Sequence, residues 1–198
     1  MKVIFNFFPV LQYMNVPNII TTVGLVFGIV ACYFLVSRNL QWALICLSFA
    51  MLMDLVDGFL AEKLNQQTQF GQYVDSLVDF FICCIVPIML VFIFVGNYLV
   101  LFAALAFYCA CGLWRLAYYN VREADNTFIG LPVPGAMLLV CMAVWSVVAY
   151  GFPSWLIYVV LFFCGLLMIS FVRLQKYGLW QKALWVLGLV FFASVVVS

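Results

Sequence analysis

The sequence predicts an all-α, polytopic integral membrane protein built as a bundle of transmembrane helices. Of its 198 residues, 69% are hydrophobic and only 8% are charged, whereas globular domains carry about 25% charged residues. The apolar residues gather in about seven runs, each near the ~20 residues that cross a bilayer as a helix. Strands are not expected, because an open strand edge in hydrocarbon leaves backbone groups unpaired.

Short polar breaks, several containing Gly or Pro, separate the apolar runs and define the expected helices in order. The breaks are residues 37–39, the polar hairpin 65–70, Gly96-Asn97, the stretch 120–130, the turn 151–154 and the basic stretch 173–177. The expected spans are 19–36, 40–64, 71–95, 98–119, 131–150, 155–171 and 179–197. We expect one membrane domain over residues 1–198, with little chain left for a second domain.

The charged residues fall on one side of the predicted bundle. Alternate threading places every Lys and Arg except Arg38 at the amino terminus or in the loops after spans two, four and six. This bias predicts that side to be cytoplasmic. The acidic residues belong to the same side, so we expect the function at the cytoplasmic interface, and the polarity weighs against a transporter.

The composition also excludes several chemistries. The chain has no His, so imidazole catalysis and His-ligated metals are excluded. Its eight cysteines lie within apolar runs and are interpreted as small buried hydrophobes. Residues 1–15 lack a small-residue cleavage pattern, so a removable signal peptide is not expected. A net charge of +1 without a basic patch predicts no nucleic-acid partner.

Four aspartates are the candidate reactive groups. Asp54 and Asp57 lie three residues apart near the end of the second span, and Asp75 and Asp79 lie four apart at the start of the third. Each pair shares a helix face, and the short hairpin makes the two helices antiparallel neighbours, so both pairs can converge. Clustered carboxylates repel one another unless cations lie between them. Oxygen ligands favour Mg²⁺ or Mn²⁺, and four carboxylates suit a two-metal site.

Small residues accompany the aspartates. Gly58 and Ala61 continue the first face and Gly71 begins the second, which leaves room for a ligand. The alternative is that these acids cap and solvate helix ends near Lys63.

Residues 54–62 read DLVDGFLAE, and after eight further residues 71–79 read GQYVDSLVD. This stretch resembles the signature of the CDP-alcohol phosphotransferases, Asp-x2-Asp-Gly-x2-Ala-Arg-x8-Gly-x3-Asp-x3-Asp, and departs from it only at Glu62, where the family has Arg. The resemblance implies a membrane enzyme of six core helices, residues 15–172, with 173–198 as an additional helix. It also implies a homodimer that moves a phosphoalcohol group from a CDP-linked donor to a hydroxyl and releases CMP.

The resemblance also implies roles for individual residues. Asp54, Asp57 and Asp75 would hold one metal ion, and Asp54, Asp75 and Asp79 the other, with Asp79 also acting as the general base. The cytidine pocket would be lined by Gly58, Ala61, Gly71, Asp57 and Asp75. Independently, phosphoryl transfer needs cations on the diphosphate and a carboxylate within reach of the attacking hydroxyl.

Glu62 reverses the charge that the family places next to the nucleotide. Neighbouring Lys63 is a candidate replacement cation, although one residue along a helix is a rotation of about 100 degrees. Either the pocket is rearranged or activity is weakened.

Other segments resemble the phosphatidylserine synthase branch of this family. Residues 17–21 (PNIIT) place Asn18 and Thr21 on one face near the predicted nucleotide, where a simple helix start is the rival interpretation. Residues 65–71, 115–121 (RLAYYNV) and 128–136 also resemble that branch. Arg115, with Asn120 and Lys63, is a candidate for binding an acceptor carboxylate or a lipid phosphate. For Arg115, marking the cytoplasmic helix end is an equal alternative.

The sequence therefore predicts a phosphatidyltransferase of a bacterial or archaeal cytoplasmic membrane. It would use CDP-diacylglycerol, two Mg²⁺ or Mn²⁺ ions and, as acceptor, L-serine, among membrane lipids and as a homodimer. One alternative is another small alcohol acceptor. The other is a non-catalytic membrane interaction protein that kept the fold, which Glu62 favours.

Overall fold

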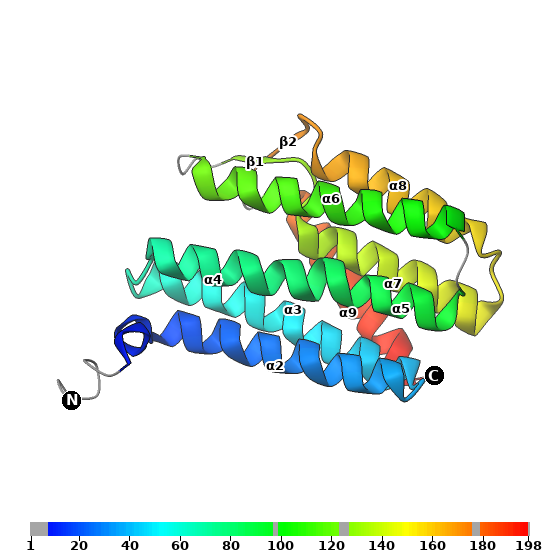
Figure 1. Ribbon diagram of the computed structural model, residues 1–198, viewed down its shortest axis with the longest axis horizontal. Coiled ribbons are helices and arrows are strands. Elements are labelled where there is room, and N and C mark those ends of the chain that lie inside the picture. Colours follow the sequence, from blue (N-terminus) through cyan, green and yellow to red (C-terminus); the bar gives the residue numbers. More distant parts are fainter. Residues whose placement is uncertain (1–7, 97–98, 123–126, 176–178, 198) are drawn as a thin grey trace.

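The computed structural model describes residues 8–96, 99–122, 127–175 and 179–197, and its long helices lie side by side in one bundle (Figure 1). The predicted helical membrane bundle is confirmed. Four of the charged residues predicted for the cytoplasmic side lie outside the described residues: Lys2, Glu123, Asp125 and Lys176.

The elements follow the predicted spans closely. In chain order they are η1 (Pro9–Tyr13), α2 (Val16–Val36), α3 (Leu40–Lys63), α4 (Gln69–Phe80), the π-helix η2 (Phe81–Ile85), α5 (Val86–Phe94), α6 (Leu99–Val121), β1 (Thr127–Ile129), α7 (Val133–Tyr150), α8 (Trp155–Met168), β2 (Arg173–Gln175) and α9 (Leu179–Val197).

Three of the helices begin at side-chain caps that the sequence supplies. Asn15, Asn39 and Thr68 precede α2, α3 and α4, and each side chain accepts the backbone N–H three residues later, at 2.9–3.2 Å. Such caps satisfy an amide that the helix cannot pair internally. The cap at Thr68 fixes where α4 starts, and therefore where its aspartates face.

Five helical segments among the described residues are long and apolar enough to cross a membrane. They are Val16–Val36, Leu40–Lys63, Gln69–Phe94, Leu99–Val121 and Val133–Tyr150; two shorter apolar helices are Trp155–Met168 and Val186–Val197. Many outward side chains on these helices are apolar, including Leu99, Phe102 and Trp114. An apolar exterior is what a lipid environment requires, so the chain is an integral membrane protein.

Close packing around α2 relies on two glycines. A Cβ at Gly28 would lie 2.9 Å from Ile82 Cγ1, and one at Gly24 would lie 3.3 Å from Met53 Cβ. These two glycines, four residues apart on one face of the helix, therefore let α2 approach both α3 and η2.

Two features of the chain were not predicted. The third span is interrupted by η2, so α4 and α5 are joined through a wider turn. A two-stranded antiparallel pair, in which Thr127 faces Gln175 and Ile129 faces Arg173, links the segments before α7 and after α8. Gly130 follows β1 with φ of 73°, and a Cβ there would clash with the Met168 carbonyl oxygen, so the position requires glycine.

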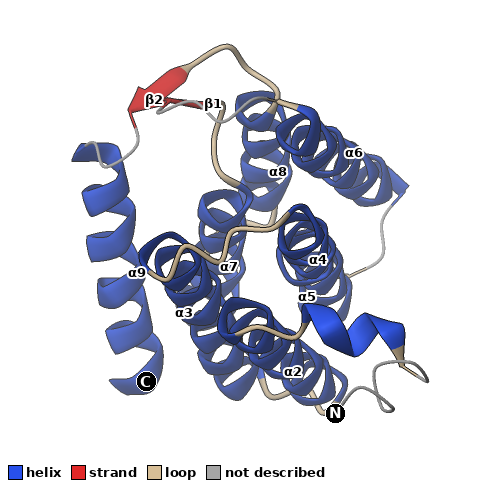
Figure 2. Cartoon of the chain, turned by 90° about the vertical axis from the view of Figure 1, so that its left-hand side faces the viewer, coloured by secondary structure: helices blue, strands red, loops and turns tan. Residues whose placement is uncertain are grey.

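Seen end-on, the core lies among the helices α2, α3, α4, α5, α6, α7 and α8 (Figure 2). Helix α9 lies outside this group and packs against α3. The core contains large side chains that are fully buried, among them Leu44, Leu90, Leu105, Tyr108 and Leu161. The polar α3–α4 hairpin and the start of α2 lie at the same end of the bundle (Figure 1).

Candidate active site

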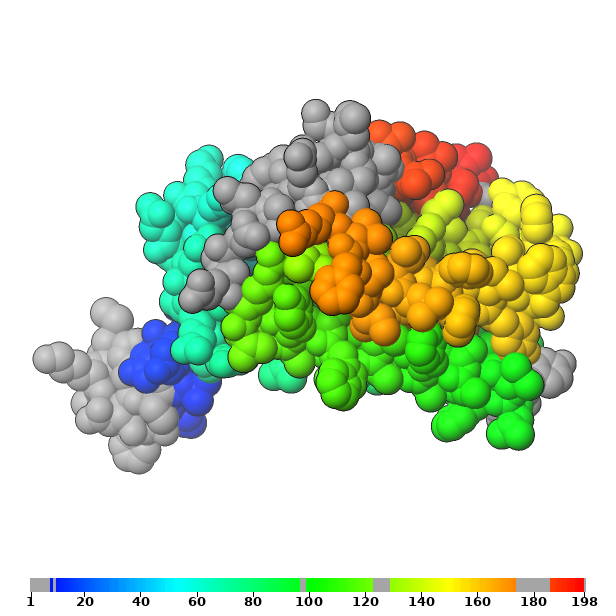
Figure 3. Space-filling view, turned by 90° about the horizontal axis from the view of Figure 1, so that it is seen from above, coloured from blue at the N-terminus to red at the C-terminus, as the bar shows by residue number. Residues whose placement is uncertain are grey.

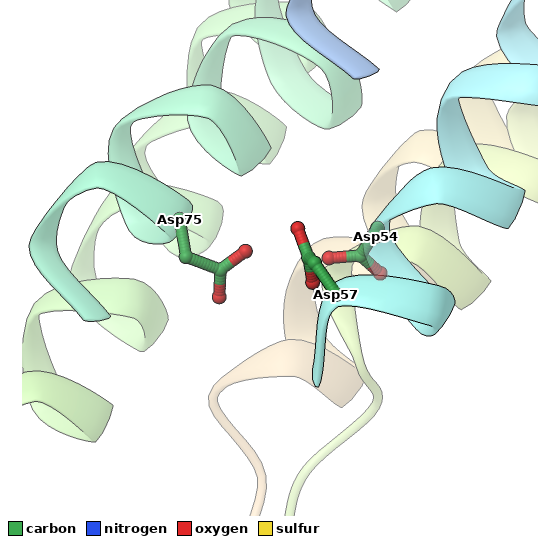
Figure 4. Close-up of side chains that lie close together, drawn as sticks. All are labelled: Asp54, Asp57 and Asp75. Atoms are coloured by element: carbon green, nitrogen blue, oxygen red, sulfur yellow. The ribbon is translucent and has the colours of Figure 1, made fainter. Parts of the chain in front are cut away.

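Three aspartates form a compact acidic cluster at the polar end of the bundle. Asp54 and Asp57 come from the last turns of α3 and Asp75 from α4, and one carboxylate oxygen of each lies within 4.8 Å of those of the others. Asp75 points across the helix gap toward the two α3 side chains (Figure 4). Asp57 is buried, at 5% exposure, and the other two are partly buried.

Asp79 adjoins this cluster from the next turn of α4. Its carboxyl group lies within hydrogen-bonding reach of Asp54. Among the described residues, the group that shares one potential metal position contains the first three aspartates. The structure thus brings together the four acids singled out from the sequence, with Asp79 joined through Asp54.

Thr21 orients the most buried carboxylate. The Thr21 hydroxyl donates a hydrogen bond to Asp57 Oδ2. The Thr21 hydroxyl oxygen also lies 3.1 Å from the Pro17 carbonyl oxygen, one helical turn earlier in α2. Thr21 is itself buried, at 5% exposure. This contact fixes the side chain of Asp57 from a different helix.

The donor set fits a hard divalent cation. All three clustered ligands are carboxylates, which Mg²⁺ and Mn²⁺ favour. Like charges held within 4.8 Å in a partly buried site repel strongly. A cation among them relieves that repulsion, so the cluster has the chemistry of a metal site.

A pocket of about 400 Å³ opens beside the cluster, between the start of α2, the end of α3, the hairpin and the start of α4. Every residue expected to bind the nucleotide lines it: Asn18, Thr21, Asp57, Gly58, Ala61, Gly71 and Asp75. The structure thus brings residues from three helices to one cavity.

Two glycines shape this pocket in different ways. A Cβ at Gly58 would meet nothing within 4 Å, so a side chain there would project into open space. A Cβ at Gly71 would lie 2.8 Å from Asn18 Oδ1, which places the start of α4 directly against α2. Asn18 also donates to the Tyr13 carbonyl at 2.9 Å.

The hairpin and the first turn of α4 contribute residues to which the sequence analysis assigned no binding role. Gln66, Gln67, Thr68 and Gln72 line the pocket, as does Pro17. Gln66 Oε1 is buried with no hydrogen-bond partner among the described residues, as expected of a group that receives a ligand. The amide side chains in 65–69 were the available signal: this segment was interpreted as a polar hairpin that resembles the phosphatidylserine synthase branch, without a binding role for its side chains.

Glu62 and Lys63 take different positions. Glu62 lines the nucleotide pocket, so the acidic substitution lies at the cavity itself. Lys63 is exposed and its ammonium lies 5.7 Å from the centre of the Phe59 ring. Lys63 is not among the residues that line the pocket. The structure therefore does not bring this lysine to the place of the family's arginine.

Arg115 lies at a second cavity of about 220 Å³ between α6 and the end of α8. In Figure 3 the end of α8 and the residues just after it, in orange, lie against α6, in green. Arg115 is only 7% exposed, its guanidinium is 4.7 Å from the Tyr119 ring centre, and its Nε lacks a hydrogen-bond partner among the described residues. Arg115 is close enough to Asp79 to attract its charge.

Asn120 does not line either cavity. Its side-chain amide donates to Ser76 Oγ at 2.9 Å and so ties α6 to α4, between Asp75 and Asp79.

A helical membrane bundle with an acidic cluster beside a polar pocket defines a class of membrane enzyme that works on charged groups at the lipid surface. The family model for CDP-alcohol phosphatidyltransferase matches residues 14–166. Because the match covers most of the chain, the protein belongs to this family of transferases.

Curated relatives extend the comparison. The CDP-diacylglycerol–serine O-phosphatidyltransferase of Methanocaldococcus jannaschii is 32% identical over 86% of this chain and 78% of its own length. The enzyme of the same name from Helicobacter pylori is 27% identical over 91% of this chain and 81% of its length. A CDP-diacylglycerol–glycerol-3-phosphate 3-phosphatidyltransferase of Aquifex aeolicus is 41% identical over 33% of this chain and 37% of its length.

Proposed function

We propose that this protein transfers the phosphatidyl group from CDP-diacylglycerol to L-serine and releases CMP. The observation that carries the proposal is the acidic cluster opening on a pocket lined by all seven residues expected at the nucleotide. A cytidine diphosphate group in that pocket would lie next to the carboxylates. The lipid chains of the same substrate would remain in the bilayer beside the bundle.

Asp54, Asp57 and Asp75 would hold one divalent ion, and Asp54, Asp75 and Asp79 a second, with Mg²⁺ or Mn²⁺ as the candidates. When bound, such ions neutralise the diphosphate and stabilise charge on the departing CMP. The contact from Thr21 keeps Asp57 turned toward this site. Asn18, Gly58, Ala61 and Gly71 would allow the cytidine to approach the helix backbones closely.

Asp79 would act as the general base. It would take the proton of the acceptor hydroxyl as that oxygen forms its bond to the lipid-bearing phosphorus, and the bond from phosphorus to the CMP oxygen breaks. The electron pair of the broken bond leaves with CMP. Asp79 is suited to this role because its carboxyl group lies next to that of Asp54.

The cavity at Arg115 is the candidate acceptor site. A free amino acid brings a carboxylate, and a guanidinium with an unpaired N–H can bind one. The names of two relatives that match most of the chain support serine. Glycerol 3-phosphate, named for a relative that matches a shorter segment, would place a phosphate at the same arginine.

The wider architecture belongs to the same proposal. Residues 1–198 would form one membrane domain, with six core spans in 15–172 and a seventh in 173–198. The polar end would face the cytoplasm of a bacterial or archaeal cell, where CDP-linked substrates and free serine meet the membrane. Two copies would associate as a homodimer among membrane lipids.

The test is transfer of radiolabelled phosphatidyl group by the purified protein in lipid nanodiscs with Mn²⁺ or Mg²⁺. Separate reactions would contain serine, glycerol 3-phosphate, inositol or no acceptor. A labelled lipid formed only with serine supports the full proposal. A product with a different alcohol corrects the acceptor. No product with either metal would favour the non-catalytic alternative, for which Glu62 in the pocket is the motivating observation.

A further inference from the structure

A buried tyrosine of α6 reaches the span that carries Asp75 and Asp79. Tyr108 is fully buried, and its hydroxyl donates to the Cys83 carbonyl oxygen at 2.8 Å. Cys83 lies within η2, the π-helix between α4 and α5. A side-chain hydroxyl is thus placed on a backbone carbonyl in the middle of a membrane-spanning segment.

The sequence explains why this carbonyl needs an outside donor. In a regular α-helix the Cys83 carbonyl would accept the N–H of residue 87, but residue 87 is a proline and has none. The proline ring would also collide with that carbonyl. Within hydrocarbon an unpaired backbone group costs several kcal/mol. The chain widens here instead, and the Val86 N–H bonds to the Phe81 carbonyl, five residues back.

The wide turn determines how Asp79 is presented. It begins two residues after Asp79, and the Phe81 N–H is shared between the carbonyls of Leu77 and Val78 at the end of α4. A π turn places an extra residue in the helix, so it rotates the segment before it relative to the segment after it. The facing direction of Asp79 relative to the packed face of α5 therefore depends on this turn.

One face of α6 holds the whole segment in place. Tyr108, Gly112 and Arg115 are spaced at i, i+4 and i+7, which puts them on the same side of the helix. Tyr108 contacts the turn, and a Cβ at Gly112 would lie 2.5 Å from Cys84 Sγ. Arg115 attracts Asp79. This face of α6 therefore lies along the third span, from η2 to the end that carries Asp79.

We infer that Tyr108 is a positioning residue for Asp79, acting through the Cys83 carbonyl and the π turn. The inference rests on the proposed function, in which Asp79 is the base. Tyr108 bears on the reaction without touching substrate. The nucleotide pocket is lined by the start of α2, the end of α3, the hairpin and the start of α4, and Tyr108 has no part in it.

The first test is Tyr108→Phe in the full-length protein in nanodiscs, measured by CMP release with serine and Mn²⁺. This change keeps the ring and removes only the hydroxyl. We expect kcat to fall by about tenfold to a hundredfold, as small displacements of a catalytic group do, with KM for CDP-diacylglycerol within about twofold. Tyr158→Phe, the same change on α8, is the matched control and should leave both constants unchanged.

The second test perturbs the same π turn through a different contact. Gly112→Ala places a methyl group against Cys84 Sγ and should lower kcat with the same unchanged KM. Adding Cys84→Ala removes the colliding sulfur and should restore kcat. A purely structural role predicts instead that stability, kcat and KM change together.

The outcomes separate the inference from the function. One outcome would overturn the inference alone. In it, the wild-type protein is active, Asp79→Asn abolishes the activity, and Tyr108→Phe leaves kcat unchanged. The inference would also be overturned if Tyr108→Phe and Gly112→Ala lowered kcat and raised KM by similar factors. Failure of Cys84→Ala to restore the kcat of Gly112→Ala would overturn it as well. Wild-type protein inactive with every acceptor would overturn the proposed function and this inference with it.

Discussion

Among single residues, Thr21 has the clearest link between one contact and the chemistry. It donates to the most buried aspartate from a neighbouring helix. A hydrogen bond to a charged group contributes about 1.5–3 kcal/mol. Losing this one would free the Asp57 side chain to turn away from the cluster.

Thr21→Val keeps the shape of this side chain and removes its hydroxyl. We expect activity to fall by about tenfold, equivalent to ~1.4 kcal/mol, with a higher Mn²⁺ concentration needed for half-maximal rate. The measurement is the rate of CMP release across a Mn²⁺ titration. Thr22→Val, on the exposed side of the same helix, is the control. An unchanged metal dependence for Thr21→Val would contradict the account.

Gly58 offers a way to block the pocket without disturbing the fold. A Cβ there meets nothing within 4 Å, so Gly58→Val should leave the melting temperature nearly unchanged. The added side chain would occupy space assigned to the nucleotide, and we expect KM for CDP-diacylglycerol to rise by at least about tenfold. Wild-type kinetics from this variant would mean that the nucleotide binds elsewhere.

Glu62 is the residue at which this chain departs from its family's motif. Because its side chain lines the pocket, Glu62→Arg would replace a negative charge with a positive one near an anionic ligand. We expect KM for CDP-diacylglycerol to fall about threefold to tenfold at low salt, and less at high salt. Steady-state kinetics at two ionic strengths would measure it. A rise in KM would show that Glu62 has a role of its own here.

At the residue scale, the sequence could predict that the acids and the small residues lie close together, but it could not predict which hairpin side chains line the pocket. Helix periodicity put Asp54, Asp57 and Gly58 along one face of a helix, and the short hairpin put Asp75 on the neighbouring antiparallel helix. Gln66 could not be found this way, since it lies in the loop between α3 and α4, and the path of a loop depends on tertiary contacts. Lys63 follows Glu62 on α3, and its ammonium lies near the Phe59 ring rather than in the lining of the pocket.

At the scale of elements, the helices could be predicted and their irregularities could not. Apolar run length fixes where a membrane helix starts and ends to within a few residues. The turn at η2 follows from Pro87, which was visible in the sequence, but a proline can also kink a helix. The pairing of β1 with β2 joins segments distant in sequence, and nothing local specifies it.

The outer helix α9 provides the prediction at this scale. It packs on α3 and α7, and the described residues that line the nucleotide pocket and the acidic cluster come from other segments. Ending the chain after residue 178 should lower the melting temperature, because it removes apolar packing and the hydrogen bond of 2.9 Å from the Gln41 amide to the Val195 carbonyl oxygen. We expect kcat per folded molecule to stay within about twofold, because these contacts lie away from the site. Thermal unfolding and kinetics in nanodiscs would measure both. Loss of activity in a folded truncated protein would give α9 a part in the reaction.

At the scale of the whole molecule, polarity is concentrated at one end of an otherwise apolar bundle. The acidic cluster, the amide-rich hairpin and Arg115 lie at the ends of α3, α4 and α6 that meet there (Figure 1). Such an arrangement lets a charged headgroup be handled at the membrane surface while acyl chains stay in lipid. The bundle thus separates the two halves of its proposed substrate.

The central claim is that the carboxylates of α3 and α4 hold divalent ions beside a cytidine nucleotide. The most direct measurement is a Mn²⁺ anomalous difference map from crystals grown with Mn²⁺ and CDP-diacylglycerol. The account predicts peaks between Asp54, Asp57 and Asp75 and toward Asp79, with cytidine density between Asn18 and Gly58. Ordered nucleotide in another cavity, or carboxylates turned apart with no peak between them, would contradict it.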